Sequence, residues 1–259
     1  MKSERQGGRQ MSQQHDYVIG KNAVIETLKS DRELYKLWMA ENTVKGQAQQ
    51  VIELAKKQNI TIQYVPRKKL DQMVTGQHQG IVAQVAAYEY AELDDLYQIA
   101  EKRNEQPFFI ILDEIEDPHN LGSIMRTADA VGAHGIVIPK RRAVGLTTTV
   151  AKASTGAIEH IPVAKVTNLS RALDEMKERG IWVAGTDASA KQDYRQFDGT
   201  MPLALVIGSE GKGIGRLIKE KCDFLIKLPM AGKVTSLNAS VAASLLMYEV
   251  YRKRYPLGE

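Results

Sequence analysis

The sequence predicts an α/β protein with a parallel sheet in its C-terminal part and a small α/β domain in front of it. From Phe108 onward, short continuous apolar runs alternate with stretches of helical apolar spacing, a pattern typical of a parallel sheet that is covered on both faces. Residues 17–88 repeat this mixture on the scale of a small domain. Hydrophobic residues make up 43% of the 259 residues, which is sufficient for packed cores.

The N-terminal part divides into a tail, a domain and a linker. Residues 1–16 are polar and rich in Gln, Gly and Arg, so we expect a disordered tail. The domain 17–88 starts with a short helix that Asn22 can cap. It continues with strands at 34–40, 61–65 and 80–87 and helices at 47–58 and 68–74. Residues 89–106 lack a strong apolar face, and we interpret them as a linker that is helical in part.

The C-terminal domain, 107–259, carries the alternating pattern in full. We expect six strands, at 108–112, 135–138, 161–164, 181–184, 203–207 and 224–228. We expect four helices, at 121–131, 169–179, 214–221 and 239–254. Ligands of open parallel sheets bind beyond the carboxyl ends of strands. The loops after Leu112, Ile207 and Leu228 are therefore the predicted site.

Composition excludes several classes of protein. The single cysteine, Cys222, cannot form an internal disulfide and has no cysteine partners for a zinc site, which favours a reducing compartment. The N-terminus has no apolar signal region and no run reaches about 18 apolar residues, so we expect a cytoplasmic protein without a membrane segment. The net charge of +4 is modest, but basic residues cluster at 67–69, 140–142 and 252–254. These clusters fit either phosphate contacts or ordinary solvated faces.

The first loop, 113–120, offers carboxylates and an asparagine at the start of a helix. Its four carboxylates lack the regular ligand spacing of a calcium loop, so a solvated turn is favoured over a metal site, and we expect no metal. Asn120 suits a helix N-cap. Arg126 shares a helix face with Ser123 and Thr127, opposite the apolar residues Leu121, Ile124, Ala128 and Val131.

The other two loops are rich in glycine and in capping residues. Residues 208–215 fail the phosphate-loop pattern, because Gly211-Lys212 is followed by Gly213, and they also fail the dinucleotide fingerprint GxGxxG. A glycine-rich loop still permits close backbone approach to a ligand. In the third loop Ser236 and Asn238 both suit an N-cap of the last helix.

Taken in order, the three loops resemble the motifs of the SpoU (TrmH-like) family of SPOUT RNA 2′-O-ribose methyltransferases. The resemblance covers about 108–251. It lies in Asn120 with Arg126, in the run 207–211, and in Leu228-Pro229-Met230 through 236–240. The run 19–24 resembles the L30e-like substrate-binding domain of the subgroup that methylates a guanosine of 23S ribosomal RNA.

The resemblance implies a fold, a cofactor and an assembly. It implies a deep C-terminal trefoil knot and a homodimer with the last helix at the interface. The stripe Val241, Leu245 and Tyr248 is compatible with that interface or with the core. The cofactor is S-adenosyl-L-methionine, and the implied cofactor-binding residues are Gly208, Leu228, Leu237, Ile207 and Met230.

The implied reaction is methylation of a ribose 2′-hydroxyl during ribosomal RNA processing, and Arg126 is the implied catalytic residue. A guanidinium stays protonated, which resists a role as base. Binding of the adjacent phosphate and stabilisation of the developing alkoxide both remain open. Asn120, Ser236 and Asn238 would orient Arg126 and the ribose, and Glu210 would orient the loop or the arginine. A transfer RNA methyltransferase and a non-catalytic RNA-binding protein are the alternatives.

Overall fold

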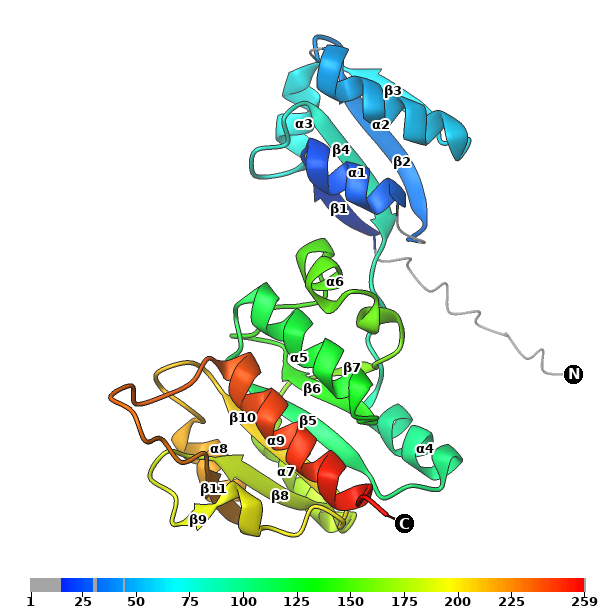
Figure 1. The fold of residues 1–259 in the computed structure, drawn as a ribbon. Helices are drawn as coiled ribbons and strands as arrows, with labels where there is room; N and C mark the ends of the chain where they lie inside the picture. Colours follow the sequence, from blue (N-terminus) through cyan, green and yellow to red (C-terminus); the bar gives the residue numbers. More distant parts are fainter. Residues whose placement is uncertain (1–14, 30–31, 44, 259) are drawn as a thin grey trace, which may run out of the picture. The chain divides into compact units, whose positions relative to one another are not determined.

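The computed structural model describes residues 15–29, 32–43 and 45–258. They form two compact units that divide between Tyr88 and Glu89 (Figure 1). Residues 1–14 of the expected disordered tail lie outside the described part. Among the described helices, none combines the length and apolarity that crossing a membrane requires.

The first unit is a four-stranded mixed sheet with helices on it. Its elements are β1 (His15–Ile19), α1 (Lys21–Lys29), β2 (Leu34–Ala40), α2 (Lys45–Lys57), β3 (Ile62–Val65), α3 (Arg67–Met73) and β4 (Ile81–Ala86). The strand order is β1-β4-β2-β3, in which only β2 and β3 are parallel. Val24, Val51 and Leu37 are buried where α1 and α2 meet the sheet.

Two expectations for this unit were wrong. His15 and Asp16, expected in the tail, begin strand β1, which pairs with β4. Their polar residue types concealed the start of an edge strand, which pairs with β4 and contributes Val18 to the core further along. Asn22 does not cap α1, because the helix already starts at Lys21.

The second unit is built on a seven-stranded parallel sheet. Its elements are α4 (Leu93–Arg103), β5 (Phe108–Asp113), α5 (Pro118–Ala130), β6 (Gly135–Pro139), α6 (Thr148–Ser154), η1 (Ala157–Glu159), β7 (Val163–Val166), α7 (Leu169–Glu178), β8 (Trp182–Thr186), β9 (Gln192–Asp193), η2 (Tyr194–Gln196), β10 (Leu203–Gly208), α8 (Arg216–Lys221), β11 (Phe224–Lys227) and α9 (Ala239–Arg254). The strand order is β7-β6-β5-β10-β8-β11-β9, and every pair is parallel.

The sheet is covered on both faces, as the continuous apolar runs predict. All six residues of β5 and all six of β10 are buried. Figure 1 shows α5 and α9 crossing one face of the sheet. On the other face, Leu173 of α7 and Ile218 of α8 pack into one core with Phe109 and Val206. The expected parallel α/β architecture is confirmed.

The segment 89–106 is helical in part, as expected, but it is not a linker. It folds with the second unit as α4, whose Leu96 is fully buried in the same core as Phe109. Glu92 and Asp95 form a capping box at its start, and Asn104 ends it in a left-handed conformation. Only two positions of this helix, Leu96 and Ala100, are buried, which explains why its apolar face was weak in the sequence.

Candidate active site

The first two loops start side by side at the carboxyl edge of the sheet. Strands β5 and β10 are adjacent and in register, so that Asp113 pairs with Gly208 at their ends. The third loop, 228–238, follows β11 on the same edge and leads into α9. The predicted convergence of the three loops is therefore a consequence of the parallel topology.

Asn120 lies in the first turn of α5 and is not its cap. Asp117 caps the helix by accepting a hydrogen bond from the His119 backbone N–H at 3.1 Å, and Pro118 is the first helical residue. Proline suits this position because its missing N–H would have no partner there. The Asn120 side chain, 8% exposed, is thus available for contacts with other loops.

The Glu210 carboxylate joins all three loops, and we call this the Glu210 junction. Its Oε1 accepts hydrogen bonds from Asn120 Nδ2 at 3.0 Å, from Ala239 N at 3.3 Å and from Asn238 Nδ2. Asn238 Nδ2 also donates to Asn120 Oδ1 at 2.9 Å. Charge-assisted hydrogen bonds of this kind are stronger than neutral ones, so the junction fixes the three loops relative to one another.

Asn238 has a second function as the cap of α9. Its Oδ1 accepts hydrogen bonds from Ser240 N at 2.9 Å and Val241 N at 3.3 Å. The side chain therefore uses its oxygen for the helix and its nitrogen for the junction. Of the two capping candidates in the third loop, Asn238 is the cap and Ser236 is not.

Gly208 lies where the second loop folds back on the strand. A Cβ at this position would lie 2.1 Å from the Gly213 carbonyl carbon and 2.2 Å from Ile214 N. The Gly213 N–H donates to Ser209 O at 2.9 Å and closes the loop. Gly211 and Gly213 have φ of +78° and +67°, a region that favours glycine.

Asp113 fastens the other end of this loop, a role that the sequence did not reveal. Its Oδ2 accepts a hydrogen bond from Gly215 N at 2.7 Å, at the start of α8. It is only 8% exposed, and burial raises the pKa of its carboxyl above the ordinary value, while the Gly215 hydrogen bond lowers it.

The expected solvated turn holds for Glu116 and Asp117, which are exposed, and is wrong for Asp113. Asp113 is buried, Asp117 caps α5, and Glu114 forms an ion pair with Arg142 at 2.9 Å. The sequence did offer one indication that Asp113 is buried, because this carboxylate directly follows a continuous apolar run. Among the described residues, no group of His, Cys, Asp and Glu side chains could hold a metal ion.

Arg126 and Ser236 lie outside the Glu210 junction. Both are exposed, and within the described ranges neither side chain is hydrogen-bonded to another residue. The opposite face of α5 is buried as expected, with Leu121, Ile124 and Ala128 fully covered. Thr127, next to Arg126, shares a 2.9 Å hydrogen bond with Ser244 of α9, which fixes the helix that carries the arginine.

The remaining cofactor candidates present apolar surface near the loops. Ile207 is 2% exposed and belongs to the core, whereas Met230 is 37% exposed. Leu228 and Leu237 are half-buried, and Leu237 directly precedes Asn238 of the junction. Three apolar side chains that are partly exposed, those of Leu228, Met230 and Leu237, therefore accompany the glycine loop.

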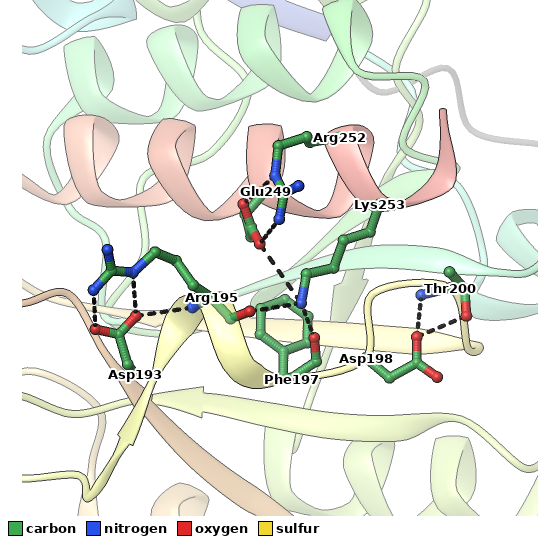
Figure 2. Close-up of polar contacts among 8 residues, drawn as sticks. All are labelled: Asp193, Arg195, Phe197, Asp198, Thr200, Glu249, Arg252 and Lys253. Atoms are coloured by element: carbon green, nitrogen blue, oxygen red, sulfur yellow. Dashed lines mark hydrogen bonds and ion pairs between the residues drawn. The ribbon is translucent and has the colours of Figure 1, made fainter. Parts of the chain in front are cut away.

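The C-terminal basic cluster has a structural role. Figure 2 shows Lys253 reaching from α9 to the segment that follows β9, where its Nζ donates to Arg195 O at 3.0 Å and to Phe197 O. Arg254 donates to the carbonyls of Gly199, Met201, Gln106 and Pro107. Arg252 pairs with the buried Glu249 at 2.7 Å. Lys253 and Arg254 are thus neither phosphate ligands nor solvated residues.

Comparisons with known proteins agree with this architecture. The profile of the SpoU rRNA Methylase family matches residues 107–248, and that of RNA 2′-O ribose methyltransferase substrate binding matches 17–91. A Bacillus subtilis protein assigned to the TrmH family of tRNA/rRNA methyltransferases is 90% identical over 249 residues, covering 96% of this chain and 100% of that protein. A Staphylococcus haemolyticus protein of the same assignment is 54% identical over 93% of this chain and 97% of its own length.

Solved structures show the same fold. The SpoU methyltransferase AviRb from Streptomyces viridochromogenes, in complex with AdoMet, has a TM-score of 0.63 and 27% identity, over 93% of this chain and 90% of its own. The AdoMet-bound rRNA methyltransferase from Sinorhizobium meliloti has a TM-score of 0.60 and 25% identity, over 92% and 87%. On the three converging loops and the two matching profiles, this chain belongs to the SpoU rRNA methylase family and is an RNA methyltransferase of the TrmH type.

Proposed function

We propose that this protein transfers a methyl group from S-adenosyl-L-methionine to the ribose 2′-hydroxyl of a guanosine in 23S ribosomal RNA. The observation that carries the proposal is the Glu210 junction, which brings Asn120 and Asn238 together from distant parts of the chain. The AdoMet complexes of the structural neighbours support the cofactor. The substrate-binding profile that matches residues 17–91 supports RNA as the class of substrate.

The residues around the second and third loops fit the adenosine part of the cofactor. Leu228, Leu237 and Met230 offer partly exposed apolar surface for an adenine, and the closed glycine loop offers backbone groups beside Gly208. When bound, S-adenosyl-L-methionine supplies an electrophilic methyl group. Asp113 and the Glu210 junction hold the two ends of the second loop, where the cofactor would bind.

Arg126 is the proposed catalytic residue. Its side chain is exposed on α5, the helix that also carries Asn120, and it brings a guanidinium to the site. We therefore assign it to stabilising the charge that develops on the 2′-oxygen, since a cation next to a developing alkoxide lowers the barrier. In this proposal Asn120, Ser236 and Asn238 orient the ribose once RNA is bound, and Glu210 orients the loop.

The proposal extends to the assembly and its location. The exposed stripe on α9, with Val241, Leu245 and Tyr248 at 47%, 45% and 51% exposure, supports a homodimer through this helix. The same proposal includes a trefoil knot in the C-terminal part. It also includes a cytoplasmic location, where ribosomal RNA is processed.

The test is methyl transfer from labelled cofactor to unmodified 23S ribosomal RNA. Arg126→Ala should lower turnover by at least about a hundredfold, as loss of one transition-state donor does, while calorimetry shows unchanged cofactor affinity. Arg171→Ala, which removes another exposed arginine from α7, should leave turnover unchanged. Normal turnover of the Arg126 variant would refute the catalytic assignment.

A transfer RNA substrate is the second candidate. The TrmH/SpoU tRNA modifying enzyme from A. aeolicus is 31% identical over 62% of this chain and 82% of its own, with a TM-score of 0.53. Label that appears in transfer RNA and not in 23S RNA would favour it. Absence of cofactor binding and of transfer to either RNA would favour a non-catalytic RNA-binding protein.

A further inference from the structure

The first unit contains a cavity of about 400 Å³ that the proposed methyl transfer does not use. It opens where the parallel strands β2 and β3 end and where α1 and α3 begin. Its volume lies within the range of sites that bind small molecules or parts of larger ligands, which is about 300–1,000 Å³.

The lining of the cavity combines an apolar floor with a polar rim. Ala40, Ala48 and Ile81 are buried and form the floor. The rim carries two cations, two amides and one carboxylate: Lys21, Arg67, Asn42, Gln79 and Glu41. Within the described part of this unit, neither cation forms an ion pair.

The walls of the cavity are fixed in place without a ligand. Thr43 Oγ1 donates to Ala40 O at 2.7 Å and holds the turn after β2. Next to this turn, the buried His78 accepts a hydrogen bond from Gly80 N at 3.0 Å, and its Nε2 lies 2.8 Å from Asp71 Oδ1, which holds the backbone on either side of Gln79. A site with walls of this kind loses little conformational entropy on binding.

Gln79 is the residue that these walls present to the cavity. Its backbone is left-handed, with φ of +51°, between the fixed His78 and Gly80. Its Oε1 accepts the Lys21 backbone N–H at 3.3 Å. The nitrogen of the same amide remains able to donate to a ligand.

We infer that this cavity binds one unpaired nucleotide of the RNA, and the inference takes RNA as partner from the proposed function. The apolar floor suits a base, the amides and the Glu41 carboxylate match the donors and acceptors on its edge, and Lys21 and Arg67 match the flanking phosphates. Bases of an A-form duplex are not accessible in this way, since sequence-specific RNA recognition targets nucleotides that are splayed out of a helix.

The test compares two fluorescent RNA probes with the full chain, a bulged hairpin and the same hairpin fully paired. The wild-type protein should prefer the bulged probe. Gln79→Gly, which removes the amide while glycine accepts the left-handed backbone, should reduce that preference by about tenfold, in the range of one specific base contact. Affinity for the paired probe should stay unchanged.

The cations are tested through the salt dependence of binding. Lys21→Ala/Arg67→Ala should lower the slope of log K against log salt for the bulged probe, by about 0.7 for each phosphate that the protein no longer neutralises. The matched control is Lys56→Ala/Lys57→Ala, which removes the same charge from the last turn of α2. The control should keep the wild-type slope.

Several outcomes would overturn the inference. The wild-type protein could bind both probes equally well, or the Gln79→Gly variant could keep the preference for the bulged probe. The two double variants could also show the same salt slope. Methyl transfer to 23S RNA is measured in parallel with the same preparations. Transfer without bulge preference refutes only the nucleotide site, whereas a Gln79-dependent preference without transfer refutes only the proposed reaction.

Discussion

Gly208 occupies a position where the protein leaves no space for a side chain. Because the atoms nearest to an added Cβ belong to the backbone of Gly213 and Ile214, rotation of a side chain cannot relieve the overlap. Gly208→Ala should displace the whole second loop. We expect the affinity for S-adenosyl-L-methionine to fall by at least about tenfold, or about 1.4 kcal/mol, as measured by calorimetry.

Gly232 provides the control within the third loop. A Cβ there meets no atom within 4 Å, so Gly232→Ala should bind the cofactor like the wild-type protein. Equal affinities of the Gly208 and Gly232 variants would contradict the steric role of Gly208.

Residue patterns indicated part of the Glu210 junction but not all of the contacts around it. The sequence indicated Asn120, Glu210 and Asn238, and the structure brings these three together. It did not separate the cap of α5 from its first turn, because Asp117 and Asn120 are both good capping residues. The partner of Asp113 is 102 residues away, and no local pattern encodes such a contact.

At the scale of elements, the end of α9 depends on Arg254. Its guanidinium donates to four backbone carbonyls, among them Gln106 O at 2.6 Å and Met201 O at 2.9 Å, and burial lowers its pKa from the ordinary value. Arg254→Ala leaves these acceptors without their donor. Because an unsatisfied buried acceptor costs about 1–3 kcal/mol, we expect the free energy of unfolding in urea to fall by at least about 2 kcal/mol.

Arg252 is the control for that measurement. Its side chain is 67% exposed and pairs with Glu249, which Lys253 also contacts. Arg252→Ala should leave the unfolding midpoint close to that of the wild-type protein. A larger loss of stability for Arg252→Ala than for Arg254→Ala would show that the carbonyl contacts do not stabilise α9.

Elements with strong apolar patterns were predicted well, and those that depend on tertiary contacts were missed. Helix α9 has the expected bounds, and β10 differs from expectation by one residue. Helix α6 was missed because its Thr-rich sequence has low helix propensity. It packs directly on Gly122 of α5, where a Cβ would lie 2.4 Å from Ala153 Cβ, so close packing compensates for the weak propensity.

For the whole molecule, the exposed stripe of α9 is the surface on which assembly is expected. Leu245→Arg places a charge within it and should convert the proposed dimer into a monomer, as measured by sedimentation velocity. Leu217→Arg is the matched control, since Leu217 is 63% exposed on α8 outside the stripe. A wild-type protein that sediments as a monomer would contradict the dimer.

The Glu210 junction also sets the time at which the proposed site can assemble. Asn120 and Asn238 are separated by 118 residues, so the ribosome must synthesise the whole intervening segment before the last partner exists. Chains fold progressively from the N-terminus during synthesis, and the first unit can therefore form while the junction is still incomplete. A nascent chain would thus carry the folded first unit without an assembled Glu210 junction. Translation itself delays assembly of the proposed site until the polypeptide has passed Asn238.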